Sequence, residues 1–197
     1  MKCLFCLMVC TVFSNWSMIS ESRLVFLRDH LIKDRRSCLK TLTPADVLEV
    51  AVFASITDFE RAQEVFYLCS YNEKDYGEVL KRIGASFLGE DSALKMAQWL
   101  MPYIILGDFR ISSSDFNDAV FQGCRKVYYW LVKYFVDMMR GNPDCLSLGL
   151  DIQAIQDEIS MRSSVCQFDQ GDFYQAQLWL GLIDKLTYRG GFDEFGL

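Results

Sequence analysis

The side chains that most often catalyse reactions or bind metals are sparse in this sequence. Its one histidine, His30, has no cluster of cysteines or acids beside it. Cys3-x-x-Cys6 has the spacing of a metal or redox pair, but it lies in an apolar run without polar support. The sequence contains neither a glycine-rich dinucleotide motif nor a phosphate-binding loop. We therefore expect no enzyme, no bound metal and no cofactor.

The composition predicts one folded helical domain. Of the 197 residues, 51% are hydrophobic and 14% aromatic, which supports a real core and excludes general disorder. Only three prolines occur, and this favours helix. We interpret most of the eight cysteines as small buried side chains in a reducing compartment. The net charge of -6 argues against a nucleic-acid partner.

The N-terminal segment, residues 1–19, is separate in character. An apolar run from Cys3 to Phe13 follows Met1 and Lys2, and Asn15-Trp16-Ser17 has the form of a glycosylation site. The run is short for a membrane span. A signal peptide, a membrane anchor, a buried helix and a translation start at Met18 all stay open for this segment.

Residues 20–197 are expected to form a single all-α domain. Apolar residues recur at helical spacing, and no sustained alternation typical of strands occurs. Helical stretches are predicted at 20–33, 43–53, 58–70, 76–87, 92–109 with an interruption near Pro102, from 116 onward, 124–139, 152–159 and 173–188. Because 124–139 is apolar on most sides, we place it at the centre. The prediction is a single bundle of seven to nine helices around a central hydrophobic helical hairpin, without internal repeats.

Gly84 lies in one of these predicted helices, beside an apolar stripe. The stripe follows the i, i+4, i+7, i+11 spacing and consists of Tyr76, Leu80, Ile83 and Phe87. A glycine inside a helix costs about 1 kcal/mol relative to alanine. We expect Gly84 to be retained because it lets another helix approach closely.

Three separated stretches resemble the Bcl-2 family of apoptosis regulators. Leu-Lys-Arg-Ile-Gly at 80–84 is similar to its third homology region. Residues 116–125 are similar to its first region, with Phe116, Asp118 and Arg125 matching without a gap. Arg-Gly-Gly-Phe-Asp at 189–193 is similar to the second region, with phenylalanine in place of tryptophan. A weaker likeness at 24–31 corresponds to the N-terminal helix of the family.

The resemblance implies a Bcl-2-like fold and regulation of apoptosis. In the family, an apolar groove receives the amphipathic third-region helix of a partner, and an arginine pairs with an aspartate of that helix. The residues that would form the groove here are Val120, Phe121, Arg125 and Val127, with Arg125 as the pairing arginine. The third-region helix would comprise Tyr76, Leu80, Ile83, Gly84 and Phe87, and the second-region motif Gly190, Gly191 and Phe192.

The resemblance also implies partners and locations. The expected partners are amphipathic helices of family members, including in a homo- or heterodimer, and the mitochondrial outer membrane, whose permeability the family controls. The expected locations are the cytoplasm and the mitochondrial outer membrane. Ala85 replaces the aspartate that follows the third-region glycine. The pro- or anti-apoptotic sign is therefore undecided. Two alternatives stay open: a secreted or viral helical interaction protein, directed by its N-terminal segment, and a helical scaffold without a groove.

Overall fold

The chain folds into helices only, within the residues that the structure describes. The structure is a computed structural model in which residues 20–33, 40–141, 151–168 and 173–187 are described. The helices are α1 (Glu21–His30), α3 (Pro44–Ala54), α4 (Phe59–Phe66), α5 (Glu73–Gly84), α6 (Glu90–Leu106), α7 (Ser113–Arg125), α8 (Tyr129–Gly141), α10 (Ile152–Phe168) and α11 (Phe173–Thr187). The predicted all-α class is confirmed for these residues. None of the helices described is both long and apolar enough to cross a membrane.

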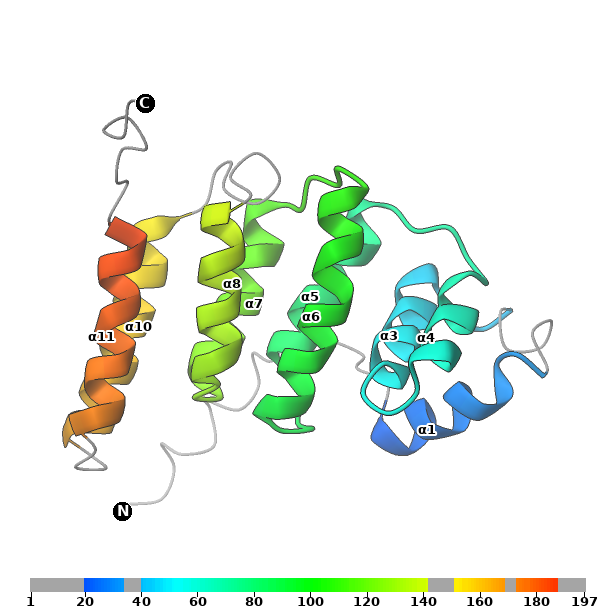
Figure 1. The fold of residues 1–197 in the computed structure, drawn as a ribbon, viewed down its shortest axis with the longest axis horizontal. Helices are drawn as coiled ribbons and strands as arrows, with labels where there is room; N and C mark the ends of the chain where they lie inside the picture. The colour runs from blue at the N-terminus through cyan, green and yellow to red at the C-terminus, as the bar shows by residue number, and fades with distance from the viewer. Residues whose placement is uncertain (1–19, 34–39, 142–150, 169–172, 188–197) are drawn as a thin grey trace, which may run out of the picture.

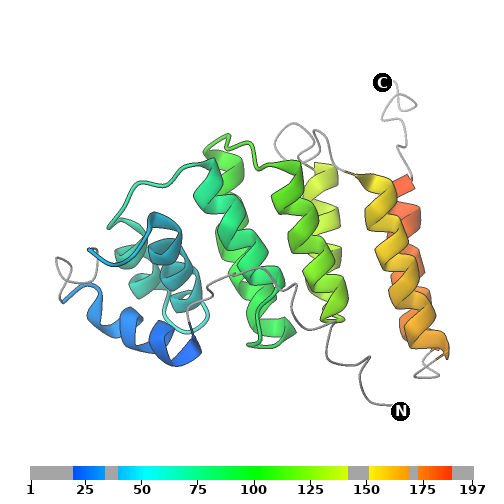
Figure 2. The same ribbon diagram turned by 180° about the vertical axis from the view of Figure 1, so that it is seen from behind.

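The helices are arranged as a row of antiparallel hairpins in two layers (Figure 1). The hairpins are α3–α4, α5–α6, α7–α8 and α10–α11, and α1 packs on α3 at one end. One layer runs through α3, α5, α7 and α10, and the other through α6, α8 and α11 (Figure 2). Because each hairpin packs mainly on its neighbours in the row, the arrangement is that of an α-solenoid.

The start of three first-layer helices follows one local pattern. A polar side chain at the N-cap accepts a hydrogen bond from the backbone N–H of an aspartate three residues later; the pairs are Thr43 with Asp46, Asn72 with Asp75, and Ser112 with Asp115. The residue after each aspartate is apolar and buried: Val47, Tyr76 and Phe116. No repeat is expected from the sequence, yet this pattern recurs in the first helix of three of the four hairpins, at α3, α5 and α7.

The expected central hairpin is replaced by this row. The segment 124–139 is not one helix, because α7 ends at Arg125 and α8 begins at Tyr129. Val127 in the turn has φ 61°, which no helix accommodates. Trp130 on α8 is 54% exposed, so this helix buries one side instead of being enclosed. The segment is apolar on most sides because it contains the end of α7 and most of α8, and the two helices bury different faces.

Two other predicted helix boundaries differ from the structure. Pro102 does not interrupt its helix: α6 continues through it to Leu106, with the proline ring on the exposed side. The stripe that ends in Phe87 is also shorter than expected, because α5 stops at Gly84. Phe87 lies in the turn before α6 and is 82% exposed.

Candidate functional site

A cavity of about 270 Å³ lies between α1, α3, α5 and the turn that follows α5. We call it the α1/α3/α5 cavity. Its apolar wall consists chiefly of Leu24, Val52, Phe53, Val79, Ile83 and Met96. Ser86, Phe87 and Leu88 of the turn complete one side, and Ser20 and Glu21 lie at the start of α1. The cavity is thus built at the end of the row where α1 covers the first hairpin.

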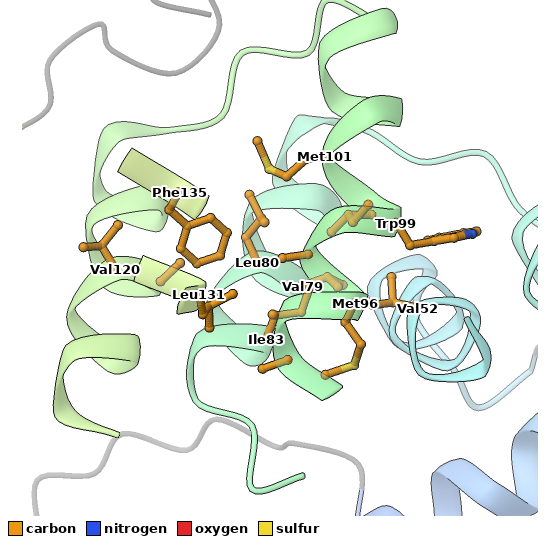
Figure 3. Packing of buried hydrophobic residues seen from close by; sticks show 14 of the residues in the cluster. Val52, Val79, Leu80, Ile83, Met96, Trp99, Met101, Val120, Leu131 and Phe135 are labelled. Atoms are coloured by element: carbon orange, nitrogen blue, oxygen red, sulfur yellow. The ribbon is translucent and has the colours of Figure 1, made fainter. Parts of the chain in front are cut away.

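The apolar wall consists of buried side chains from the faces that α1, α3, α5 and α6 direct toward one another. Figure 3 shows Val79 and Ile83 of α5 beside Met96 of α6, with Val52 of α3 nearby. Val52 is 1% exposed and Val79 is fully buried. These side chains therefore belong to the core and at the same time line the cavity.

Arg82 provides the guanidinium group of the cavity. Its Nη1 lies 2.9 Å from Asp46 Oδ1 and 2.6 Å from Glu49 Oε2, both on α3, and its Nε lies 3.3 Å from Glu78 Oε1. The Arg82 side chain is 8% exposed and that of Glu49 9%. Burial alone would lower the pKa of Arg82, but Glu49 and Asp46 outweigh it and raise the pKa. The guanidinium thus stays charged and joins α5 to α3.

The charged side chains that line the cavity are two acids, Glu21 and Glu49, and one base, Arg82. Burial by itself raises the pKa of Asp46, yet hydrogen bonds from Thr43 and Arg82 outweigh burial and hold that pKa below its usual 3.8. Glu21 also lines the cavity and forms no ion pair within the part of the chain that the structure describes. The lining of the cavity therefore carries surplus negative charge. Outside the lining, Glu78 pairs with Lys81 at 3.1 Å as well as with Arg82.

The residues predicted for the third-region helix separate into two groups. Ile83 and Phe87 line the α1/α3/α5 cavity. Tyr76 and Leu80 are buried in the core, with the Tyr76 ring 4.7 Å from that of Phe109. Gly84 faces α7, where a Cβ would lie 3.0 Å from Ala119 Cα and would collide with the Ala119 carbonyl. The expected close approach of another helix at Gly84 is therefore present, inside the protein.

The residues predicted for the groove lie on and after α7, and none of them lines the α1/α3/α5 cavity. Val120 is 1% exposed and faces the core near Leu131 and Phe135 (Figure 3). Phe121 is partly buried and packs against the core. Arg125 is exposed at the end of α7, and Val127 is 38% exposed in the next turn. The second-region motif, Gly190, Gly191 and Phe192, and the N-terminal segment 1–19 lie outside the described residues.

The sequence interpretation missed Arg82 and its carboxylates. A signal was available: Glu78 precedes Arg82 by four residues, which is ion-pair spacing on a helix. The partners on α3 gave no such signal, because only the packing of α3 on α5 brings Asp46 and Glu49 to Arg82. Arg125 was selected instead because it matched a family motif.

The other candidate chemical groups are separate from this cavity. His30 is exposed on α1, where its Nδ1 lies 2.8 Å from the carbonyl oxygen of Phe26. Cys124 is fully buried, and burial raises the pKa of its thiol to about 12. A thiol in that state is not a nucleophile at neutral pH. In the described stretches, no group of three or more His, Cys, Asp or Glu side chains is placed to hold a metal.

Comparison with known proteins gives no relative of this chain. We find no family model, no curated protein and no solved structure that matches it.

Proposed function

We propose that the protein is a binding module that takes up apolar side chains of a partner helix in the α1/α3/α5 cavity. The observation that carries this proposal is the cavity itself: an apolar hollow beside a buried, charged cluster at one end of the helical row. Binding of an amphipathic helix by an apolar groove is a recurring mode of peptide recognition.

The size of the cavity favours a protein side chain over a small-molecule ligand. Sites for small molecules and cofactors usually measure about 300–1,000 Å³ and enclose most of the ligand. At about 270 Å³, this cavity lies just below that range. It suits one or two large anchor residues, while the rest of a partner helix lies on the surface around it.

Charge selects the kind of partner. Arg82 already has three carboxylates within 3.3 Å or less, so an incoming aspartate would meet more negative charge than positive. A partner with lysine or arginine next to its apolar anchor would be attracted, with Glu21 accessible at the start of α1. This preference is the reverse of the aspartate–arginine pairing that the Bcl-2 resemblance implies.

The apoptotic role stays a prediction. In a Bcl-2-like arrangement, Arg125 would lie in the groove, whereas here Arg125 is not part of the cavity wall. Helix binding at the α1/α3/α5 cavity requires neither that arrangement nor a pro- or anti-apoptotic sign. Helices of Bcl-2 family proteins belong in the test panel for this reason.

The test is a titration of the full chain with fluorescent amphipathic helices that differ only in the charge beside the apolar anchor. We expect the lysine-bearing helix to bind more tightly than its glutamate-bearing counterpart. Val52→Phe places a ring in the cavity and should weaken binding about tenfold or more. Glu21→Lys should reverse the charge preference, so that the glutamate-bearing helix becomes the better ligand.

Glu60→Lys is the matched control, because Glu60 is an exposed acid in the first turn of α4 and does not line the cavity. It should leave both affinities unchanged. Circular dichroism and the melting temperature verify that each variant is folded. The proposal fails if no helix of the panel binds, or if Val52→Phe binds as well as the original chain.

A further inference from the structure

Exposed aromatic side chains gather along one edge of the helical row. They are Phe87 in the α5–α6 turn, Trp130 in the first turn of α8 and Tyr174 in the first turn of α11, with 82%, 54% and 68% exposure. These three places lie at the same ends of neighbouring hairpins, along the lower edge in Figure 1. With Lys126 and Val127 of the α7–α8 turn, we call these residues the tip edge.

The α5–α6 turn and the α7–α8 turn are in direct contact with one another. The Tyr128 hydroxyl donates a hydrogen bond to the Ser86 carbonyl at 3.0 Å, and Lys126 Nζ lies 3.3 Å from the centre of the Phe87 ring. Glu90 of α6 accepts the backbone N–H of Trp130, and so caps the start of α8. The α5–α6 and α7–α8 turns are therefore held in place by contacts between the two hairpins.

Val127 occupies a backbone position that normally takes glycine. Its N–H bonds the carbonyl of Cys124 at 3.0 Å, and the next N–H, of Tyr128, bonds that of Gly123 at 2.9 Å, which is the Schellman ending of α7. With φ 61°, a β-branched residue here is strained. The strain does not serve the core, because Val127 is 38% exposed. It leaves an apolar side chain partly exposed in the α7–α8 turn, and strain of this kind collects at functional surfaces.

Positive charge accompanies these apolar groups. Arg125 and Lys126 form no ion pair among the residues described by the structure. Among the acids at this end, Glu90 accepts the backbone N–H at the start of α8, Asp91 is exposed, and Glu21 lines the same cavity as Phe87. Burial raises the pKa of Asp118 on α7, and the charges of Lys81 and Arg125 partly offset that rise. Protruding rings on the tip edge therefore occur together with Lys126 and the adjacent Arg125, two cations for which the described part of the chain holds no ion pair.

We propose that the tip edge docks on the surface of an anionic lipid bilayer, with Phe87, Val127 and Trp130 in the headgroup region and Lys126 and Arg125 on lipid phosphates. Tryptophan and tyrosine prefer this interface, and basic side chains beside them are attracted to anionic lipid. A protein partner would need shaped pockets for several protruding rings, whereas the headgroup region accepts them without a counterpart. This site is separate from the α1/α3/α5 cavity except at Phe87.

The experiment measures co-sedimentation of the full chain with vesicles of phosphatidylcholine, with and without phosphatidylserine. We expect binding to the mixed vesicles and at least tenfold weaker binding to phosphatidylcholine alone. Trp130→Ala and Lys126→Glu should each reduce binding to the mixed vesicles about tenfold. Since residues 1–19 stay in every variant, any contribution from that apolar segment is common to all of them.

Val127→Gly separates a surface role from a structural one. It relieves the positive-φ strain and should raise the melting temperature, while it removes an apolar contact and weakens vesicle binding. Leu106→Ala is the control, since Leu106 is 86% exposed at the opposite end of the α6 hairpin and should not affect binding.

Trp130→Ala should also leave the titration with partner helices unchanged, so this proposal and the proposed helix binding can fail separately. Two results would overturn the lipid proposal. One is mixed-vesicle binding that Trp130→Ala and Lys126→Glu do not alter. The other is the absence of vesicle binding while an acidic peptide binds the original chain and not Trp130→Ala, which would assign the tip edge to a protein.

Discussion

The two sides of α5 are packed in opposite ways. Toward α7 the helix is in close contact, because Gly84 lies directly against the backbone of Ala119 and Leu80 is fully buried. Toward α1 and α3 the same helix borders a cavity, with Ile83 in the apolar wall and Arg82 in a cluster of carboxylates. Both environments belong to residues 80–84 of α5, on different sides of the helix.

The difference indicates which side the fold requires and which side is available for binding. A glycine that permits backbone contact contributes to close packing, whereas a cavity sacrifices contacts that a filled core would have. The ion pairs of Arg82 with Asp46 and Glu49 join α5 to α3 at the wall of the cavity. Four experiments test this comparison, and in the first three each substitution is compared with a matched one on the other side of α5 or elsewhere in the chain.

The largest effect on the free energy of unfolding is expected for Leu80→Ala, which we compare with Ile83→Ala. Leu80 lies on the closed side, and its truncation should lower the free energy of unfolding by about 4 kcal/mol. Ile83 borders an existing cavity and has fewer contacts to lose, so we expect a loss of about 2 kcal/mol. Urea denaturation of both variants measures the difference. Equal losses would show that the two sides are packed alike.

Arg82→Met should lower the free energy of unfolding by about 3 kcal/mol, because Asp46 and Glu49 would lose their buried counter-ion. Arg61→Met is the matched control: its pair with Glu64 at 3.0 Å is exposed and should contribute less than about 1 kcal/mol. Thermal denaturation at low and high salt measures both. Similar losses for the two variants would contradict a structural role for the cluster.

Gly84→Ala should lower the free energy of unfolding by about 2 kcal/mol, since the methyl group would collide with the Ala119 carbonyl. Gly181→Ala, in α11, has open space around the new methyl group and should stabilise the protein by up to about 1 kcal/mol through helix propensity. Opposite signs are expected in urea denaturation. A stabilising Gly84→Ala would mean that α5 and α7 are not in close contact.

The pH dependence of the Arg82 cluster should give the smallest effect. The pKa of Asp46 lies below its usual 3.8, so its contribution is present above that value and is lost as the pH falls through the lower folded pKa. Asp46→Asn should therefore be less stable near neutral pH by about 1 kcal/mol and approach the original chain below about pH 4. Guanidinium denaturation across this range tests the sign. A stability difference that does not narrow in acid would contradict it.

Local signals in the sequence were reliable where one helix decides the outcome. The all-helical class followed from apolar spacing, and the start of α3 followed from Thr43, Pro44 and Asp46. Gly84 was correctly interpreted as a place of close approach, because close packing of a second helix can offset the helix propensity that glycine loses. The boundary at residues 126–128 was missed because Val127 adopts a conformation that its side chain disfavours.

The candidate site depended on contacts that no local pattern contains. Spacing predicts which residues share a helical face, but not which helix that face meets. Arg125 was selected from a family motif and does not line the cavity, whereas Arg82, four residues after Glu78, has two further partners on α3.

By itself, the sequence determined that this chain forms helices, where most of them begin, and that α5 carries a glycine beside its apolar stripe. These properties depend on neighbours within a few residues, through backbone hydrogen bonds, capping and side-chain periodicity. Only the tertiary structure decided that the hairpins form a row, that Gly84 meets Ala119, and that Arg82 meets Asp46 and Glu49. Those outcomes depend on which buried faces fit together, and that is a property of the whole packed chain.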